Sequence, residues 1–176
     1  GLLLSRDKSL SKQLLAFHRI ATPQFAVFRR GARFHVPKKL RFPLFVKSTV
    51  EDASLGIAQA SVVEDAAKLK ERIEFVHEQV KSDALVEEYI EGREFFVGIL
   101  GNRQAIALPP IEMDFSGLPE GAPRFLDRNA KFGEGTVEFE GTKAKIAEID
   151  DSLAEKLQSI SLAAYRALKV RDYGRV

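Results

Sequence analysis

The sequence predicts an α+β fold, because helical patterns and turn-connected strands both occur along the chain. Apolar residues recur at helical spacing in three segments, near residues 8–18, 64–81 and 151–168. A stretch rich in apolar and β-branched residues, from Leu85 to Leu100, is interrupted by a turn at Glu91-Gly92 and followed by another at Gly101-Asn102. Helices combined with strands that reverse at short turns are typical of α+β proteins.

Composition limits the class of protein further. The chain has 176 residues, of which 45% are hydrophobic and 30% are charged, so we expect one compact domain or two small lobes and exclude disorder. The 27 basic and 25 acidic residues nearly balance, which gives no electrostatic case for nucleic acid as the main partner. The absence of cysteine excludes disulfides and thiol nucleophiles and is compatible with a cytoplasmic location. The apolar start Leu2-Leu3-Leu4 is too short for a membrane span, so no membrane partner is expected.

The first element predicted is a helix capped by Ser5 or Asp7 and ending near His18. Lys8 lies in its first turn, where a cation opposes the helix dipole unless an anion is close. A solvated lysine is the alternative interpretation of Lys8. Residues 25–28 follow as a short strand.

The next informative unit is a strand, residues 42–47, that ends in Lys47. An ammonium group at the end of a buried strand requires a counter-charge. The small residues and glycine of the following loop, 51–56, allow backbone N–H groups to approach phosphate oxygens, although no Walker motif is present. An ordinary strand with a lysine that reaches solvent remains the alternative.

The stretch from Leu85 to Leu100 is predicted to form a hairpin whose corner is rich in acceptors. Glu87-Glu88 ends its first strand just before the turn at Glu91-Gly92. Such an edge can bind the amino and hydroxyl groups of a small ligand. A solvated edge that discourages strand pairing explains the same residues.

The C-terminal third combines an irregular segment with a clear helix. Residues 114–145 are rich in glycine and contain Lys131, which indicates a functional flap or a mobile excursion. A helix is predicted to start at Asp151-Ser152, with Glu155 completing a capping box. A further strand begins at residue 172 and stops at Val176, so we expect this chain to be part of a longer one.

The order of five motifs identifies a resemblance that covers nearly the whole chain. The motifs are Asp7-Lys8 before a helix, FPLFVK at 42–47, EDASLG at 51–56, LVEEYIEGREF at 85–95 and YGRV at 173–176. This series resembles the ATP-grasp superfamily, and within it the D-alanine:D-alanine ligase-like carboxylate-amine ligases. The resemblance implies two lobes that grip a nucleotide. They would be residues 1–81, with phosphate-binding lysines and loop, and residues 82–176, incomplete at the C-terminus.

The resemblance also implies residues that bind the phosphates of ATP. Lys47 matches a strand-end lysine, Lys8 a basic residue at the start of a helix, and Lys131 a lysine of the ligase flap. Three ammonium groups would then converge on one triphosphate. Ser54 and Gly56 belong to the loop that would close over it.

The nucleoside would be bound by the segment around Glu87. That carboxylate matches the acceptor of the adenine amino group, the backbone from Glu88 to Ile90 would follow the edge of the base, and Glu94 matches the residue that binds the ribose hydroxyls. The candidate apolar walls of the adenine site are Phe45, Tyr89 and Ile90.

The catalytic residue implied by the resemblance is Arg175, which would stabilise the transferring phosphoryl group or the acyl phosphate. In family members the strand that begins with Gly174-Arg175-Val176 continues to an aspartate, and a later strand supplies a glutamate and an asparagine, which together bind magnesium. The Mg²⁺ ligands are therefore expected beyond Val176, and no residue of this chain is assigned to metal. His18, His35 and His77 lack ligand spacing and are interpreted as structural or solvated. The phosphate loop also departs from the family, with Asp52-Ala53 where a glycine and a serine are usual.

The function implied is that of the ATP-binding part of an ATP-dependent carboxylate-amine ligase, an enzyme that forms an amide bond through an acyl phosphate. ATP, a small carboxylate and an amine would be its ligands, and this piece alone is expected to be inactive. A non-catalytic nucleotide-binding or regulatory module is the alternative. A plain α+β scaffold is a third interpretation. The identity of the acid and amine and the oligomeric state stay open at this point.

Overall fold

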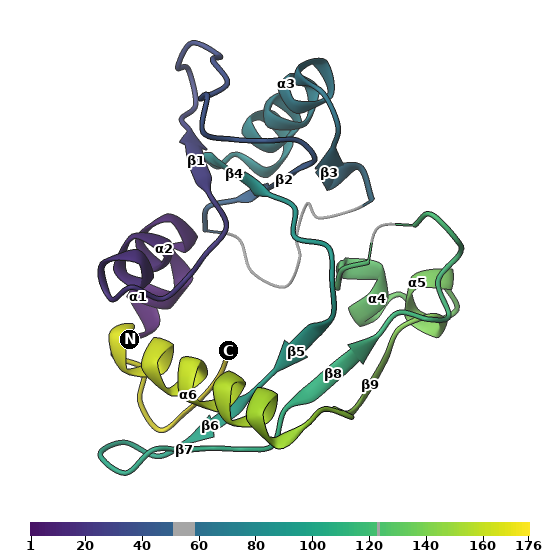
Figure 1. Ribbon diagram of the computed structural model, residues 1–176. Helices are drawn as coiled ribbons and strands as arrows, with labels where there is room; N and C mark the ends of the chain where they lie inside the picture. The colour runs from purple at the N-terminus through teal and green to yellow at the C-terminus, as the bar shows by residue number, and fades with distance from the viewer. Residues whose placement is uncertain (51–58, 123) are drawn as a thin grey trace. The chain divides into compact units, whose positions relative to one another are not determined.

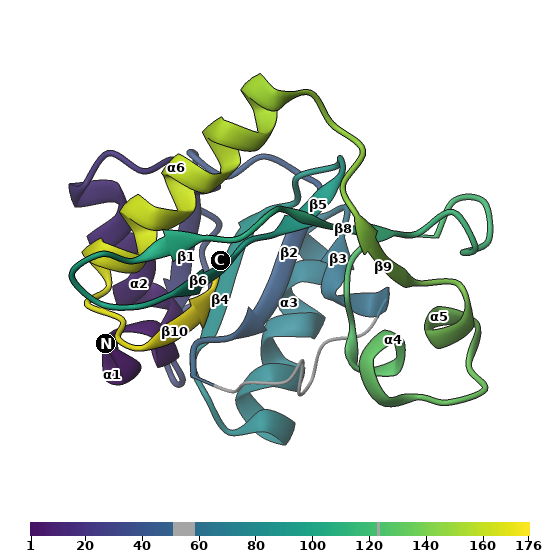
Figure 2. The same cartoon turned by 90° about the horizontal axis from the view of Figure 1, so that it is seen from below.

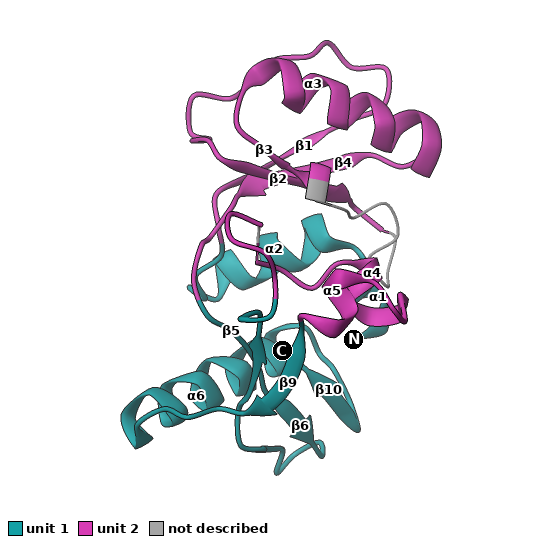
Figure 3. Cartoon of the chain, turned by 90° about the vertical axis from the view of Figure 1, so that its right-hand side faces the viewer, with its two compact units in different colours: residues 1–22, 93–117, 142–176 teal, residues 23–92, 118–141 magenta. Residues whose placement is uncertain are grey.

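The computed structural model describes residues 1–50, 59–122 and 124–176, which form two compact units. Unit 1 comprises residues 1–22, 93–117 and 142–176, and unit 2 comprises residues 23–92 and 118–141 (Figure 3). Helices and antiparallel strands occur in both units, which confirms the α+β class. No helix among the described residues is long and apolar enough to cross a membrane.

Unit 2 is built on one antiparallel sheet in the order β1-β4-β2-β3. Its strands are β1 (Phe25–Phe28), β2 (Leu44–Ser48), β3 (Val62–Val63) and β4 (Ala84–Glu88). Strand β4 lies between β1 and β2, and its residue Glu87 is opposite Phe25 on one side and Phe45 on the other. Every second residue of β2 is buried, as expected for a strand with one face toward the core.

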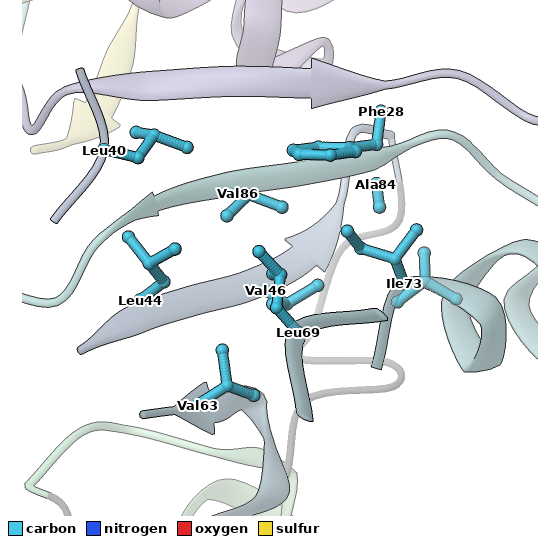
Figure 4. Packing of buried hydrophobic residues seen from close by; sticks show 10 residues of the cluster. Phe28, Leu40, Leu44, Val46, Val63, Leu69, Ile73, Ala84 and Val86 are labelled. Atoms are coloured by element: carbon cyan, nitrogen blue, oxygen red, sulfur yellow. The ribbon is translucent and has the colours of Figure 1, made fainter. Parts of the chain in front are cut away.

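One face of this sheet is covered by helix α3 (Ala66–Phe75), which continues into a π-helical turn at Val76–Val80 (Figure 1). Asp65 caps α3 by accepting a hydrogen bond from the Lys68 N–H. Leu69 and Ile73, one turn apart on α3, pack into a buried cluster with β2 and β4. Figure 4 shows this cluster, which also contains Phe28, Leu40, Leu44, Val46, Val63, Ala84 and Val86. The helix predicted near residues 64–81 is therefore confirmed.

The remainder of unit 2 contains short helices where the sequence pattern is irregular. They are α4 (Arg128–Phe132), α5 (Val137–Glu140) and a 3₁₀ turn at Gln59–Ser61. Asp127 and Thr136 cap α4 and α5 by accepting backbone N–H groups. Helices as short as α4 and α5 show no apolar periodicity in the sequence, and side-chain caps stabilise their first turns.

Unit 1 contains three helices, α1 (Leu2–Arg6), α2 (Lys8–Phe17) and α6 (Asp151–Ala167). Asp7 caps α2, and His18 ends it, as predicted. The predicted capping box of α6 is wrong, because the cap is Asp150, whose carboxylate accepts the Leu153 N–H at 2.8 Å. The extended backbone of Asp150 places its side chain within reach of that N–H group.

Two three-stranded antiparallel sheets complete unit 1. The first has the order β5-β8-β9 and consists of β5 (Glu94–Phe96), β8 (Ile111–Asp114) and β9 (Lys143–Ile146). The second has the order β10-β6-β7 and consists of β10 (Tyr173–Arg175), β6 (Gly98–Leu100) and β7 (Ile106–Ala107). Helix α6 lies alongside β6 and β7 (Figures 1 and 2). Tyr165 of α6 packs against Ile99 of β6 and donates a hydrogen bond to the Gly101 carbonyl oxygen at 2.9 Å.

The turn at Gly101-Asn102 joins β6 to β7 as predicted, but the hairpin predicted at Glu91-Gly92 is wrong. Strand β4 pairs with β1 and β2, whereas β5 pairs with β8, so the two strands flanking this turn belong to different sheets. By contact, residues 82–92 group with the strands that precede them. The predicted lobes 1–81 and 82–176 stay a prediction.

Candidate functional site

The paired strands β2 and β4 carry an ion pair between Lys47 and Glu87. In the register of these strands Lys47 is opposite Leu85, so Glu87 is its diagonal neighbour on the same face. The lysine side chain is 21% exposed and the glutamate side chain 11% exposed. Because a lysine in such surroundings needs a partner, the carboxylate offsets the cost of removing the ammonium group from water. The structure therefore brings together two residues that the sequence predicts for opposite ends of one ligand.

Three aromatic residues, Phe45, Tyr89 and Phe125, form what we call the aromatic clamp beside this ion pair. The rings of Phe45 and Tyr89 stack with their centroids 6.5 Å apart, and the Phe125 ring meets Phe45 edge-on at 5.0 Å. The Tyr89 hydroxyl accepts a hydrogen bond from the Arg124 N–H at 3.1 Å and donates one to the Arg124 carbonyl oxygen at 3.3 Å. Phe125 is a candidate site residue that the sequence interpretation missed, since nothing local links it to Phe45.

The backbone after Glu87 is held from both sides. The Glu88 N–H donates to the Gln24 carbonyl oxygen and the Tyr89 N–H donates to that of Pro43, each at 3.0 Å. Ile90 follows and is 65% exposed. The segment is thus fixed up to Tyr89 and presents Ile90 outward.

The remaining predicted residues of the phosphate site in unit 2 are Lys131, Ser54 and Gly56. Lys131 lies on α4, whose cap Asp127 is buried and accepts the Ala130 N–H at 2.8 Å. Ser54 and Gly56, together with Asp52-Ala53, lie outside the described residues.

In unit 1, Glu94 begins β5 and Arg175 ends β10, and these strands belong to different three-stranded sheets. Arg175 of β10 is opposite Gly98 of β6, and its guanidinium lies over the Phe96 ring, 4.4 Å from the centroid. Side chains alternate along a strand, so Glu94, two residues before Phe96, points to the same face. The other face of these strands packs against α6 through Ile99.

Lys8 is the first residue of α2, directly after the cap Asp7. The Asp7 carboxylate accepts the N–H groups of Leu10 and Ser9 and the Ser9 hydroxyl. These hydrogen bonds, above all that from Leu10, lower the pKa of Asp7, with a smaller contribution from the charge of Lys8. Asp7 is therefore the anion that offsets the unfavourable place of Lys8 in the helix dipole.

Arg93 and Glu112 form a second ion pair that the sequence interpretation missed. The Arg93 Nε and Nη2 atoms donate to the two carboxylate oxygens of Glu112 at 2.6 and 2.8 Å, and Nη2 also donates to the Glu148 carbonyl oxygen at 3.2 Å. The hydrogen bonds between the two side chains lower the pKa of Glu112 and raise that of Arg93. Arg93 directly precedes Glu94, so this bidentate pair holds the start of β5. In the sequence, the only local indication of this ion pair is that Glu112 stands between the apolar residues Ile111 and Met113 of a strand.

The predicted site residues are divided between the two units. Unit 1 contains Lys8, Glu94 and Arg175, and unit 2 contains Lys47, Glu87, Glu88, Tyr89, Ile90 and Lys131. Across the part of the chain that the structure describes, no three His, Cys, Asp or Glu side chains are grouped as a metal site. His77, interpreted from the sequence as structural or solvated, has its Nε2 atom 2.9 Å from the carbonyl oxygen of Phe28.

Asp114 gives a testable pH dependence in unit 1. Its carboxylate accepts the Ser116 N–H at 2.9 Å and the Lys145 ammonium at 3.0 Å, and these hydrogen bonds lower its pKa from 3.8 to about 2. Because the folded pKa is depressed, the stabilisation is fully present above pH 3.8 and is lost as the pH falls through about 2. We expect the Asp114 carboxyl carbon to titrate near pH 2 by NMR, and Lys145→Ala to raise that midpoint. A midpoint at or above 3.8 in the unchanged chain would contradict the structure.

Comparison with solved structures defines the class of protein. The chain superposes on the crystal structure of D-alanine–D-alanine ligase from Bacillus anthracis complexed with ATP, with a TM-score of 0.72 and 27% identity, over 97% of this chain and 49% of that one. The fold is accordingly an ATP-grasp fold. The family model described as "D-ala D-ala ligase C-terminus" matches residues 14–176, and the chain belongs to this family. The resemblance inferred from the five motifs is confirmed.

The chain is also similar to curated proteins. The chain is 37% identical over 173 residues to "Uncharacterized protein y4sG" of Sinorhizobium fredii, covering 98% of this chain and 48% of that protein. It is 32% identical over 172 residues to D-alanine–D-alanine ligase of Bacillus anthracis, covering 97% of this chain and 51% of that enzyme. The chain spans about half the length of these relatives.

Proposed function

We propose that this chain is the ATP-binding part of an ATP-dependent ligase that joins a small carboxylate to an amine, in the manner of D-alanine–D-alanine ligases. The observation that carries the proposal is the Lys47–Glu87 ion pair beside the aromatic clamp. It places a cation, a carboxylate and an apolar surface together, and these are the groups required by phosphate, by an exocyclic amino group and by a purine ring, respectively. The ligase names of the relatives favour catalysis over a non-catalytic nucleotide-binding module.

In this proposal the nucleotide uses groups that are already paired. Lys47 turns its ammonium group toward a phosphate oxygen, while Glu87 accepts a hydrogen bond from the adenine amino group. The backbone from Glu88 to Ile90 follows the edge of the base, and Tyr89 and Phe45 form its apolar walls. We further propose Glu94 as the acceptor of the ribose hydroxyls and Lys8 as a contact of the phosphates.

The reaction we propose has two steps. The substrate carboxylate attacks the γ-phosphorus of ATP, which breaks the bond to the bridging oxygen and gives an acyl phosphate and ADP. The amine then attacks the acyl carbon, loses a proton and expels inorganic phosphate, which leaves the amide. Lys131 and Arg175 stabilise the negative charge of the transferring phosphoryl group and of the acyl phosphate.

Magnesium accompanies ATP in such reactions and is usually held by one or two carboxylates together with the phosphates. Among the described residues no three carboxylate or histidine side chains are grouped as ligands, and the proposal assigns none of them to the metal. We therefore derive no step through the metal from these residues. The expectation that its ligands lie beyond Val176 stays a prediction.

Calorimetric titration with ATP tests the nucleotide site. We expect Lys47→Ala and Glu94→Ala each to weaken binding about tenfold, the cost of one charge-assisted hydrogen bond. Lys68→Ala and Glu71→Ala are matched controls on the exposed face of α3, where both side chains are more than half exposed. Failure of a folded sample to bind ATP, or equal affinity in the site and control variants, would reject the proposed site. Release of phosphate from ATP in the presence of D-alanine, measured on the full-length protein, tests the catalytic part separately.

A further inference from the structure

The polypeptide that leads to Lys131 is attached to the sheet of unit 2 by the aromatic clamp. Phe125 packs edge-on against Phe45 of β2, and the preceding residue, Arg124, is bonded to Tyr89 just after β4. This attachment lies entirely within unit 2. A segment distant in sequence is thereby held by the ends of two central strands.

The Tyr89 hydroxyl bonds to Arg124 in both directions. A phenol has one hydrogen to donate and lone pairs to accept, and here the donor and one acceptor site are used by the N–H and the C=O of the same residue. Two bonds to one peptide residue fix both its distance from the ring and its orientation. Removing only the hydroxyl would release Arg124 while leaving the stacking of the ring on Phe45.

Only a few residues separate this anchor from Lys131. Three residues after Arg124, the buried carboxylate of Asp127 caps α4, and Lys131 follows four residues later, about one helical turn into α4. The chain from the anchor through the cap to the lysine leaves little length over which a displacement at Arg124 can be absorbed. A shift of Arg124 would therefore carry α4 with it.

We propose that the Tyr89 hydroxyl is a positioning group for Lys131, holding α4 so that this lysine meets the triphosphate of a bound nucleotide. The inference rests on the proposed function, in which Lys131 contacts the phosphates. One residue then serves two parts of the same ligand. The ring of Tyr89 borders the base, and its hydroxyl positions Lys131, the cation that contacts the phosphates.

A double-mutant cycle with Tyr89→Phe and Lys131→Ala tests the proposal. We expect each single variant to weaken ATP binding about fivefold in calorimetry, and the double variant to be no weaker than Lys131→Ala alone, because the hydroxyl acts only through the lysine. Additive losses, or an unchanged affinity in Tyr89→Phe, would overturn the positioning role. If Lys131→Ala leaves ATP binding unchanged while Lys47→Ala weakens it, the role of Lys131 fails but the nucleotide site stands.

Limited proteolysis gives a second readout that requires no nucleotide. Trypsin cleaves after Arg124, Arg128 and Lys131, and we expect Tyr89→Phe to accelerate cleavage at these bonds severalfold in the native protein. Tyr165→Phe is the matched control, because it also removes a tyrosine hydroxyl bonded to a backbone carbonyl, at Gly101 in unit 1. Equal cleavage rates at the three bonds in both variants would show that the hydroxyl does not hold this segment.

Discussion

Replacement of Glu87 by alanine is expected to lower the free energy of unfolding by about 2–4 kcal/mol. The change removes the carboxylate and leaves the Lys47 ammonium group near the end of β2 with most of its surface out of water. The penalty of an unpaired charge in such a place exceeds the net value of the ion pair itself, since the intact pair already bears a desolvation cost. The loss is smaller than for a fully buried pair because the Lys47 side chain is partly exposed.

The double variant Glu87→Ala/Lys47→Met separates the two contributions. It removes both charges and retains an apolar side chain on β2, so we expect it to recover most of the stability lost in Glu87→Ala. Urea unfolding at neutral pH, followed by circular dichroism, measures both. Equal destabilisation of the single and double variants would indicate that the loss comes from packing and that the charges contribute little.

The second large effect is expected for Leu69→Ala, at about 2–5 kcal/mol. Leu69 has no exposed surface and packs from α3 onto the buried side chains of β2, which include Leu44 and Val46. The truncated side chain would leave a cavity that a sheet on one side and a helix on the other cannot readily close. The same urea unfolding experiment measures the loss.

Ile90→Ala is the matched control for Leu69→Ala. It removes the same number of carbon atoms from the same unit, but its side chain is mainly in solvent, so we expect a change within about 0.5 kcal/mol. A loss at Leu69 no larger than that at Ile90 would contradict the packing described for unit 2.

The longer elements of the fold were predictable because local chemistry determines them. Helix α2 begins at its cap Asp7, and α3 shows a continuous apolar face that includes Leu69. Helix α1 and the two short helices α4 and α5 have too few turns to generate a period, and caps such as Asp127 stabilise α4 and α5 instead. The predicted capping box of α6, with Glu155 as its second member, lies two residues after the observed cap, because three consecutive carboxylate or hydroxyl residues, starting at Asp150, can all act as caps.

The candidate site was predictable as single residues and not as pairs. Lys47 and Glu87 stand out in the sequence as charges at the ends of apolar strands, but their contact depends on the register between β2 and β4. The same limit explains the wrong hairpin, since a turn at Gly92 shows where the chain bends and not which strand β4 joins. Contacts such as Arg93 with Glu112 arise from tertiary pairing, for which a single sequence carries no direct indication.

The pairing of β8 with β9 has a consequence for how the chain avoids misassembly. In the observed alignment Glu112 is opposite Lys145 and Asp114 is opposite Lys143, while apolar residues face apolar residues between them. A slip by one residue in either direction would place Lys145 opposite an apolar residue, Ile111 or Met113, and Glu112 opposite Ala144 or Ile146. Two lysines on a strand at the sheet edge also repel a second strand of like charge. The alternation therefore selects one alignment during folding and discourages the growth of the sheet into aggregates.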